Sequence, residues 1–447
     1  MLTPKTAGGP ATGKLKKVLG LAFGLAIVVG GTIGVGILRA PASIAAVLPS
    51  PGLILLCWVL IGLYILLTAS SYAELTTMMP KAGGAYNYIQ RAFGPYAGFI
   101  NGWFDFVSNA IAPAYFCIVI GEYCSLLFPV LKPFSSAVSI GFLTLFTAIN
   151  LPGVKSGSLT QQLTSAIKIL LFLVLIAGCF LSPHTHAEGL VRPLAKGSLL
   201  LGAVRALQLI NGAYDGWMSV SFFAEEDKDP GKNIPKSYLI GALTVMVLYL
   251  LINAAILWVL PIDFIAGAPL VASDAASVAF GKWSSDFVVI IAVFSLISIL
   301  NAYIMIPPRI LFGMGRDGFF LRSGAKVNKG GTPYVSLLLC YALSFILILV
   351  SSFEQLFGLG VFFMDMVFIF AFLSLIRLRK KEPDLPRPYK AWGYPYTTYF
   401  ALVASIVLFV VFAIGDRVSL VIFLGANAVL WGMYHGVVKK GLSRVGA

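Results

Sequence analysis

Long apolar runs, separated by short polar segments, make up most of the chain after about residue 18. Two examples are Leu239–Leu260 and Tyr396–Ile414. A membrane-spanning helix needs about 20 mostly apolar residues, whereas the strands of membrane barrels alternate apolar and polar residues over about ten positions. The pattern therefore predicts an all-α integral membrane protein with about twelve spans. We place them at 18–47, 51–78, 95–128, 135–151, 159–181, 199–224, 234–260, 284–314, 334–350, 356–378, 396–414 and 418–436.

The composition excludes a water-soluble protein. Of the 447 residues, 59% are hydrophobic and 11% are charged, whereas soluble domains have about 45–50% and about 25%. Mean hydropathy is +0.91. The five cysteines have neither the spacing of a redox pair nor that of a zinc site, so we expect them to be small buried side chains. We expect no cofactor and no metal.

The formal net charge of +14 indicates membrane topology rather than a nucleic-acid surface, and no nucleic-acid partner is expected. An even number of spans puts both termini on one side. Segments of that side hold most of the Lys and Arg residues, whereas the opposite loops hold only Lys132, Arg192, Lys196, Lys282 and Arg417. Cytoplasmic loops are enriched in Lys and Arg. We therefore expect a bacterial inner-membrane protein with two cytoplasmic tails, 1–17 and 437–447.

Two spans contain glycines that disfavour a continuous helix. The first has Gly30, Gly31, Gly34 and Gly36, and the sixth has the segment Asn211–Trp217 with two glycines and an acid. Each glycine costs about 1 kcal/mol relative to alanine inside a helix. Close packing of neighbouring helices is one explanation. The other is that both spans are discontinuous helices, which mark the binding site of many secondary transporters.

The offsets between spans indicate an internal repeat. Spans 1 and 6, 2 and 7, and 3 and 8 are separated by similar numbers of residues. We therefore divide the chain into a first repeat (18–181), a second repeat (199–378) and two further spans (396–436). Because five spans form each repeat, the second must be inverted in the membrane.

Helix breaks provide backbone groups that can bind a zwitterion. The N–H groups of Val35, Gly36 and Ile37 would begin a half-helix and favour a carboxylate. Carbonyls of half-helix ends would accept hydrogen bonds from an ammonium, and an α-amino acid has both charged groups. The predicted substrate-binding residues are Thr32, Ile33, Gly34, Val35, Gly36, Ile37, Gly212, Ala213, Tyr214 and Asp215. Asp215 either caps a half-helix or faces a cationic substrate.

Four stretches resemble the amino acid–polyamine–organocation superfamily, and within it the bacterial relatives of L-type amino acid transporters. They are Ile33-Gly34-Val35-Gly36-Ile37-Leu38, Pro80-Lys81-Ala82-Gly83-Gly84-Ala85-Tyr86, Tyr214-Asp215-Gly216-Trp217 continuing to Pro235, and Arg309 with Met314-Gly315-Arg316-Asp317-Gly318. The resemblance implies the five-plus-five inverted fold of leucine transporters and alternating access. The chain departs from the family pattern at Val35, Leu38 and Gly212, and the last replaces an aromatic gate.

The resemblance also assigns a role to Lys168, which lies within the fifth span. It matches a lysine that takes the place of a bound sodium ion in sodium-independent relatives. The alternative is that Lys168 extends to the cytoplasmic interface. For the other charged residues at membrane depth we expect pairing between helices; these are Arg39, Asp105, Glu122, Arg205, Arg309 and Asp365.

The sequence thus predicts a sodium-independent transporter of L-amino acids that works by exchange or proton-coupled uptake. Neutral amino acids are favoured, and the alternatives are a carrier of cationic amino acids or polyamines, or a channel. An enzyme would need a cluster of catalytic groups, and we find none in the sequence, so we do not expect an enzyme. The expected partners are the substrate, protons and membrane lipids. The external segment 128–133 has no cysteine, so we expect a monomer without a covalently bound accessory subunit.

Overall fold

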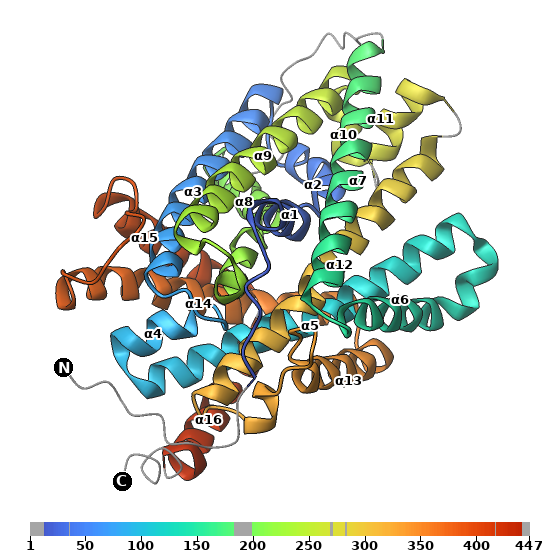
Figure 1. The fold of residues 1–447 in the computed structure, drawn as a ribbon. Helices are drawn as coiled ribbons and strands as arrows, with labels where there is room; N and C mark the ends of the chain where they lie inside the picture. Colours follow the sequence, from blue (N-terminus) through green and yellow to red (C-terminus); the bar gives the residue numbers. More distant parts are fainter. Residues whose placement is uncertain are drawn as a thin grey trace.

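A computed structural model describes residues 13–34, 36–182, 199–268, 271–281, 284–415 and 417–439, and these residues form helices and no named strand (Figure 1). The α-helices are α1 (Leu21–Thr32), α2 (Gly36–Ala45), α3 (Pro51–Met78), α4 (Tyr86–Phe93), α5 (Pro95–Leu127), α6 (Ser135–Asn150), α7 (Val154–Leu181), α8 (Leu199–Ala213), α9 (Pro230–Val259), α10 (Ile262–Gly267), α11 (Val271–Phe280), α12 (Ser284–Arg316), α13 (Tyr334–Val350), α14 (Phe353–Lys381), α15 (Tyr396–Gly415) and α16 (Arg417–Met433). Short 3₁₀ segments are η1 (Pro129–Phe134), η2 (Trp217–Glu226) and η3 (Arg322–Ala325), and η4 (Tyr434–Val438) is a π-helical turn.

The prediction of an all-helical membrane protein is confirmed. Within the described residues, eight helical segments are long and apolar enough to cross a membrane, and three shorter apolar helices accompany them. Many side chains of these helices face outward although they are apolar, such as Leu56, Leu170 and Val421. An outer surface of this kind requires a lipid environment.

Several helices begin where local sequence signals predict. The Ser50 hydroxyl accepts a hydrogen bond from the N–H of Leu53, and Pro51 occupies the first turn of α3. Gly94 has a φ of 94° and separates α4 from α5. Ser352 and Gln355 form a capping box at the start of α14. Caps of this kind satisfy N–H groups that have no partner within the helix.

The first predicted span is interrupted. The helix α1 ends at Thr32, the following Ile33 is extended with φ −75° and ψ 101°, and α2 begins at Gly36. Gly30 and Gly31 lie inside α1, and a Cβ on Gly30 would be 2.2 Å from Ser165 Oγ. Gly34 and Gly36 have no contact this close. Both explanations of the glycine cluster therefore apply. Gly30 and Gly31 permit close packing of helices, and Gly34 and Gly36 lie at the helix break.

The second interruption follows α8, which ends at Ala213. Gly216 has a φ of 100°, in the left-handed region, and the chain then continues as the 3₁₀ segment η2. A Cβ on Gly216 would be 2.3 Å from the carbonyl oxygen of Gly31. Only glycine combines this φ with so close an approach. The two interruptions thus lie against each other.

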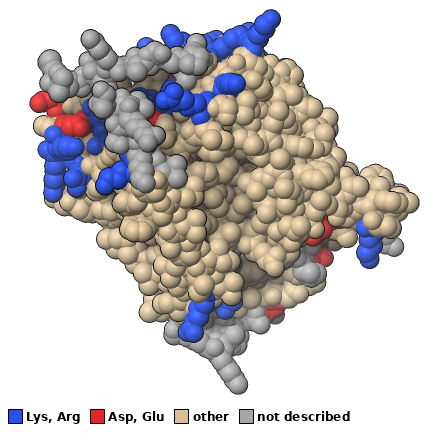
Figure 2. Space-filling view, turned by 90° about the horizontal axis from the view of Figure 1, so that it is seen from below, with Lys and Arg blue, Asp and Glu red and all other residues tan. Residues whose placement is uncertain are grey.

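Ion pairs join helices at one end of the molecule. The buried Glu226 carboxylate accepts hydrogen bonds from Arg309, with 2.9 Å between Nη2 and Oε2. Glu225 pairs with Arg316 at 2.8 Å. On the face drawn in Figure 2, most Lys and Arg residues gather toward one end, and a broad surface with few charges separates them from a smaller group at the opposite end.

Glu74 of α3 joins the same end to the segment between α14 and α15. Its carboxylate contacts Arg379 at 2.6 Å, Arg387 at 3.2 Å and the N–H of Ala391 at 2.7 Å. The Glu74 side chain is 0% exposed. Because a buried charge needs partners, this carboxylate holds the segment after α14 against α3.

Glu74→Ala is expected to destabilise the fold by about 3–5 kcal/mol, since it leaves buried arginines without their partner. The control is Glu382→Ala, which removes the surface partner of Arg91; the two side chains are 25% and 43% exposed. An exposed pair contributes about 0–1 kcal/mol. Thermal unfolding in detergent compares the two variants. Equal melting temperatures would contradict the role given to Glu74.

Candidate functional site

A cavity of about 580 Å³ lies beside the two helix breaks. Small-molecule sites typically measure about 300–1,000 Å³. The lining comes from eight α-helices, the 3₁₀ segment η2 and the breaks: Thr32, Gly34, Gly36, Ala40, Ser43, Tyr64, Ile65, Thr68, Tyr115, Phe116, Arg205, Gln208, Leu209, Asn211, Gly212, Ala213, Asp215, Trp217, Ile299, Tyr303, Met364, Asp365, Phe368, Phe372, Ser405, Leu408 and Phe412. The lining is mostly apolar, with few polar groups that could orient a ligand.

Six of the ten residues predicted to bind substrate line this cavity: Thr32, Gly34, Gly36, Gly212, Ala213 and Asp215. Ile33, Ile37 and Tyr214 are instead buried in the apolar core. Val35 lies outside the described residues. The sequence pattern places a backbone segment near the cavity, but the local backbone direction decides which side chains enter it.

Gly36 begins α2, a helix of ten residues, and lies exposed at the cavity. The first N–H groups of a helix have no intrahelical partner, and the helix dipole makes this end partially positive. A Cβ on Gly36 would make ordinary contact with Ala213, at 3.6 Å from its Cα. Nothing lies within 4 Å of a Cβ on Gly212. The cavity therefore has an anion-favouring end with free space around it.

Most of the carbonyls freed by the breaks already have protein partners. The Ile33 carbonyl accepts hydrogen bonds from Lys168 Nζ and from Ser295 Oγ, the latter at 2.9 Å. Tyr249 of α9 donates to the Ala213 carbonyl at 2.8 Å and is 3.3 Å from that of Thr32. A single hydroxyl thus touches both breaks. Sequence reasoning missed Ser295 and Tyr249, whose only signal is a polar group within an apolar span.

Lys168 of α7 is completely buried, and its ammonium reaches α1 rather than the membrane interface. Its Nζ donates to the Gly30 carbonyl at 2.8 Å and to the Ile33 carbonyl. A positive charge therefore sits beside the last turn of α1, where the helix dipole is negative. Among the described residues, the ammonium bonds to backbone carbonyls and forms no ion pair, so backbone dipoles stabilise it.

Polar side chains next to Lys168 hold α1 in place. Ser165 donates to the Ala26 carbonyl at 2.9 Å, and Gln161 Nε2 is 3.2 Å from the same oxygen. Asn301 of α12 donates to Gln161 Oε1 at 2.8 Å. Buried polar groups of this kind are stable because each finds a partner. They keep α1 at a defined position against α7 and α12.

Asp215 bonds to the backbone of the next residue and also lines the cavity. Its Oδ1 accepts a hydrogen bond from the N–H of Gly216 at 2.9 Å, and its side chain lines the cavity. It thus stabilises the left-handed turn at Gly216. It also presents negative charge to whatever occupies the cavity.

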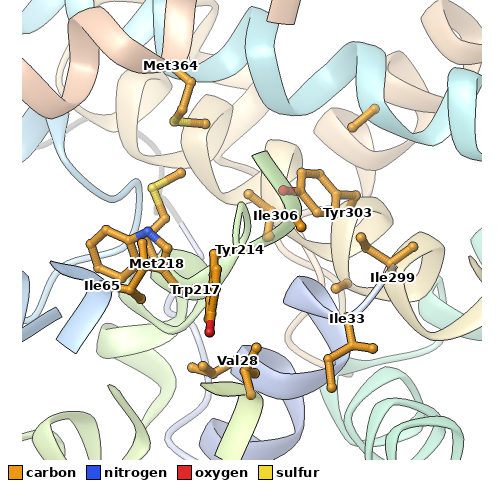
Figure 3. Packing of buried hydrophobic residues seen from close by; sticks show 14 of the residues in the cluster. Val28, Ile33, Ile65, Tyr214, Trp217, Met218, Ile299, Tyr303, Ile306 and Met364 are labelled. Atoms are coloured by element: carbon orange, nitrogen blue, oxygen red, sulfur yellow. The ribbon is translucent and has the colours of Figure 1, made fainter. Parts of the chain in front are cut away.

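Aromatic rings close the cavity toward the end that holds the ion pairs. Trp217 stacks on Phe368 with ring centroids 5.7 Å apart, and Tyr72 meets the Trp217 ring edge-on at 5.1 Å. Figure 3 shows Trp217 and Tyr214 between Val28 and Ile33 of α1 on one side and Met364 of α14 on the other. In the opposite direction the lining continues along α2 and α8 as far as Ser43 and Arg205. Packed rings therefore bound the cavity at the end near the ion pairs.

A carboxyl near the closed end lies outside the predicted spans. Tyr86 of α4 donates to Asp317 Oδ2 at 3.1 Å. Burial raises the pKa of the Asp317 carboxyl, and the charges of Arg316 and Lys81 partly oppose this rise. The loop before α4 is thereby tied to the end of α12.

Among the charged residues at membrane depth, pairing between helices holds for Arg309, which binds Glu226. Asp105 accepts a hydrogen bond from Asn109 of the same helix at 2.9 Å. Asp365 of α14 lines the cavity, and its Oδ2 has no hydrogen-bond partner. For Asp365, we expect by default a partner on another helix, and among the described residues its Oδ2 lacks one.

The described residues contain no group of three or more His, Cys, Asp or Glu side chains that could hold a metal ion. Their cysteines are free, and four of the five are buried. The polar groups of the cavity are thus backbone N–H groups, hydroxyls, amides and three charged side chains. Such a set can form hydrogen bonds and ion pairs with a small ligand.

Similarity to known proteins identifies the family of the chain. A family model described as amino acid permease matches residues 19–436. The serine/threonine exchanger SteT of Bacillus subtilis is 27% identical over 434 residues, covering 95% of this chain and 98% of the relative. The b(0,+)-type amino acid transporter 1 of Rattus norvegicus is 29% identical over 394 residues, covering 85% and 80%. The branched-chain amino acid permease BcaP of Bacillus subtilis is 28% identical over 445 residues, covering 94% and 93%. With the family model matching nearly its whole length, this chain belongs to the amino acid permease family of membrane transporters.

Proposed function

We propose that this chain is a sodium-independent secondary transporter that moves L-amino acids through the cavity beside its two helix breaks. Membership of the permease family establishes amino acid transport as its activity and excludes an enzyme. The observation that carries sodium independence is the Lys168 ammonium on the carbonyls of Gly30 and Ile33. A permanent cation there satisfies oxygens that a bound sodium ion would otherwise coordinate.

The proposed topology has twelve spans arranged as two inverted repeats, 18–181 and 199–378, followed by 396–436. In this topology α1 with α2 forms one span, and α8 with η2 forms another. The pairing of one interrupted helix in each repeat supports it. The larger group of Lys and Arg residues in Figure 2 supports an inner-membrane location with cytoplasmic tails 1–17 and 437–447.

The proposed conformation is open to the outside. The lining extends along α2 and α8, whereas Trp217, Phe368 and the ion pairs of Glu225 and Glu226 lie at the other end. Alternating access then requires these pairs to separate as the cavity opens to the cytoplasm. The buried pair between Glu226 and Arg309 contributes most to keeping that end closed, because water does not screen it.

Substrate binding uses the free backbone end of α2. The α-carboxylate binds the N–H groups at the start of α2, where Gly36 lets it approach closely. The α-ammonium lies near Asp215 and the end of α8. The side chain then extends into the wider part of the cavity, which is lined by apolar residues and a few acids. Neutral amino acids suit the apolar lining, and cationic ones suit its acids.

Transport is driven either by exchange of substrates across the membrane or by a proton gradient. A channel is the alternative from another class, and it needs a continuous polar path. The stacked rings of Trp217 and Phe368 oppose such a path in this conformation. Uptake that accelerates after preloading with internal substrate supports a carrier, whereas flux that rises linearly with concentration supports a channel.

Gly36→Leu is expected to abolish amino acid binding while the protein still folds. A leucine side chain would occupy the space through which a carboxylate reaches the N–H groups of α2. Gly36→Ala is the control, because its Cβ makes only ordinary contact with Ala213. Binding is measured by thermal shift with a panel of L-amino acids. Unchanged affinity in Gly36→Leu would move the site away from α2.

Lys168→Ala is expected to lower turnover at least tenfold in proteoliposomes, with or without sodium. The change leaves the Gly30 carbonyl without its buried donor, which costs about 1–3 kcal/mol. Lys155→Ala removes an exposed lysine from the first turn of the same helix and should leave turnover unchanged. Sodium-stimulated uptake by the unmutated protein, or full activity of Lys168→Ala, would refute the assignment.

Lys168→Arg tests whether this lysine also carries a proton. Arginine keeps the positive charge but does not lose its proton in proteins. The variant should retain exchange and lose accumulation driven by an inward pH gradient. Accumulation equal to that of the unmutated protein would remove the proton-carrier role and leave the structural one.

The purified chain alone is expected to transport amino acids after reconstitution. One relative is named a small subunit of a large neutral amino acids transporter. Here the segment 128–133 has no cysteine, and Cys124 lies within α5 rather than in that segment. This segment therefore offers no cysteine that could form a disulfide bond with a partner polypeptide. Activity that appears only after a second polypeptide is added would contradict this proposal.

A further inference from the structure

Asp365 is a buried acid, and one of its carboxylate oxygens has no hydrogen-bond partner among the described residues. It lies on α14, lines the cavity and is 7% exposed, and its Oδ2 has no hydrogen bond. The buried acids Glu74 and Glu226 each bind arginine, whereas Asp105 also has an oxygen without a hydrogen bond but does not belong to the cavity lining. Leaving a carboxyl without a partner in a buried place is unfavourable. A ligand with a positive group would relieve this cost.

The hydroxyls of the same wall do not provide a partner. Tyr64 and Ser405 also line the cavity, and their oxygens lie 3.4 Å from each other. Among the described residues of the lining, the charged ones are Arg205, Asp215 and Asp365. Two acids thus face one base, and Arg205 belongs to the outer half of α8. The inner cavity has a net negative lining.

Asp365 belongs to a different element of the cavity lining from the helix breaks. Gly36 and Asp215 belong to the breaks, whereas Asp365 belongs to the wall formed by α3, α14 and α15. Both Gly36 and Asp365 line the same cavity. An amino acid held at Gly36 would therefore direct its side chain toward this wall.

We infer that Asp365 forms a cation-binding subsite for the side-chain end of the substrate, so that the carrier takes amino acids with a terminal ammonium. This inference rests on the proposed function, because it uses the same cavity. Asp365 would act as a specificity residue through direct contact. A neutral side chain of equal length leaves the carboxyl unpaired, and the site discriminates against it for that reason.

The test compares three probes on the purified full-length protein in proteoliposomes. L-Lysine has the terminal ammonium, L-norleucine has the same carbon chain without it, and cadaverine has two ammonium groups but no carboxylate. The variants are Asp365→Asn, which keeps the shape, and Asp286→Asn, which removes an exposed acid at the start of α12. Competition against labelled L-lysine and direct uptake of labelled L-norleucine are both measured.

We expect L-lysine to bind the unmutated protein at least tenfold more tightly than L-norleucine. Asp365→Asn should weaken L-lysine about 10- to 100-fold, as loss of a charged hydrogen bond does, and leave L-norleucine within about twofold. Asp286→Asn should change neither. Cadaverine should bind far more weakly than L-lysine, because it lacks the group that binds at Gly36.

Other results overturn the inference and leave the proposed function intact. These are equal affinity for L-lysine and L-norleucine, an unchanged L-lysine affinity in Asp365→Asn, or an equal loss of both amino acids in that variant, which would indicate a structural or coupling role. Cadaverine binding as tight as that of L-lysine overturns the amino acid part of the inference. If the unmutated protein binds and transports none of the amino acids, the proposed function itself is wrong.

Discussion

Backbone groups that lie within a membrane protein must find partners inside the molecule, and the rest of this structure depends on how the two helix breaks meet that need. Water does not supply hydrogen bonds at this depth, so each unpaired carbonyl or N–H is costly. Lys168, Ser295 and Tyr249 satisfy the carbonyls of Gly30, Ile33 and Ala213. The N–H groups at the start of α2 remain for a ligand. At the first break, the carbonyl groups are therefore paired within the protein, and we propose that the N–H groups of α2 bind a ligand.

The charged side chains also follow the requirement that buried polar groups find partners inside the molecule. At the closed end, the buried acids Glu74 and Glu226 bind arginines and join helices that are distant in sequence. In the cavity, Asp215 holds only the N–H of Gly216, and one oxygen of Asp365 holds nothing. Paired charges stabilise one conformation, whereas unpaired ones provide binding capacity. This contrast separates the residues that join helices at one end from those that we propose to recognise a substrate.

The glycines of the first span illustrate how far a pattern can be interpreted. Four glycines in a short segment predicted either tight packing or an unwound helix. Gly30 packs against Ser165 and Gln161 inside α1, whereas Gly34 and Gly36 lie at the break. Composition cannot separate these cases, because glycine both allows close approach and weakens a helix. Which effect dominates at each position depends on the neighbouring helix.

Hydropathy and glycine placement were enough to predict a helical membrane protein, the approximate limits of its helices and the two segments where the helix is interrupted, because these features depend on local sequence and on the thickness of the bilayer. The family motifs then indicated amino acid transport. Neither the hydropathy pattern nor the motifs could predict contacts between segments that are distant in the sequence. No local pattern relates Tyr249 to both breaks, turns the side chains of Ile33 and Ile37 away from the cavity, or leaves Asp365 without an arginine while Glu226 has one. Those features arise only when α3, α9, α12 and α14 pack around α1, since packing decides which polar groups face each other and which face a space.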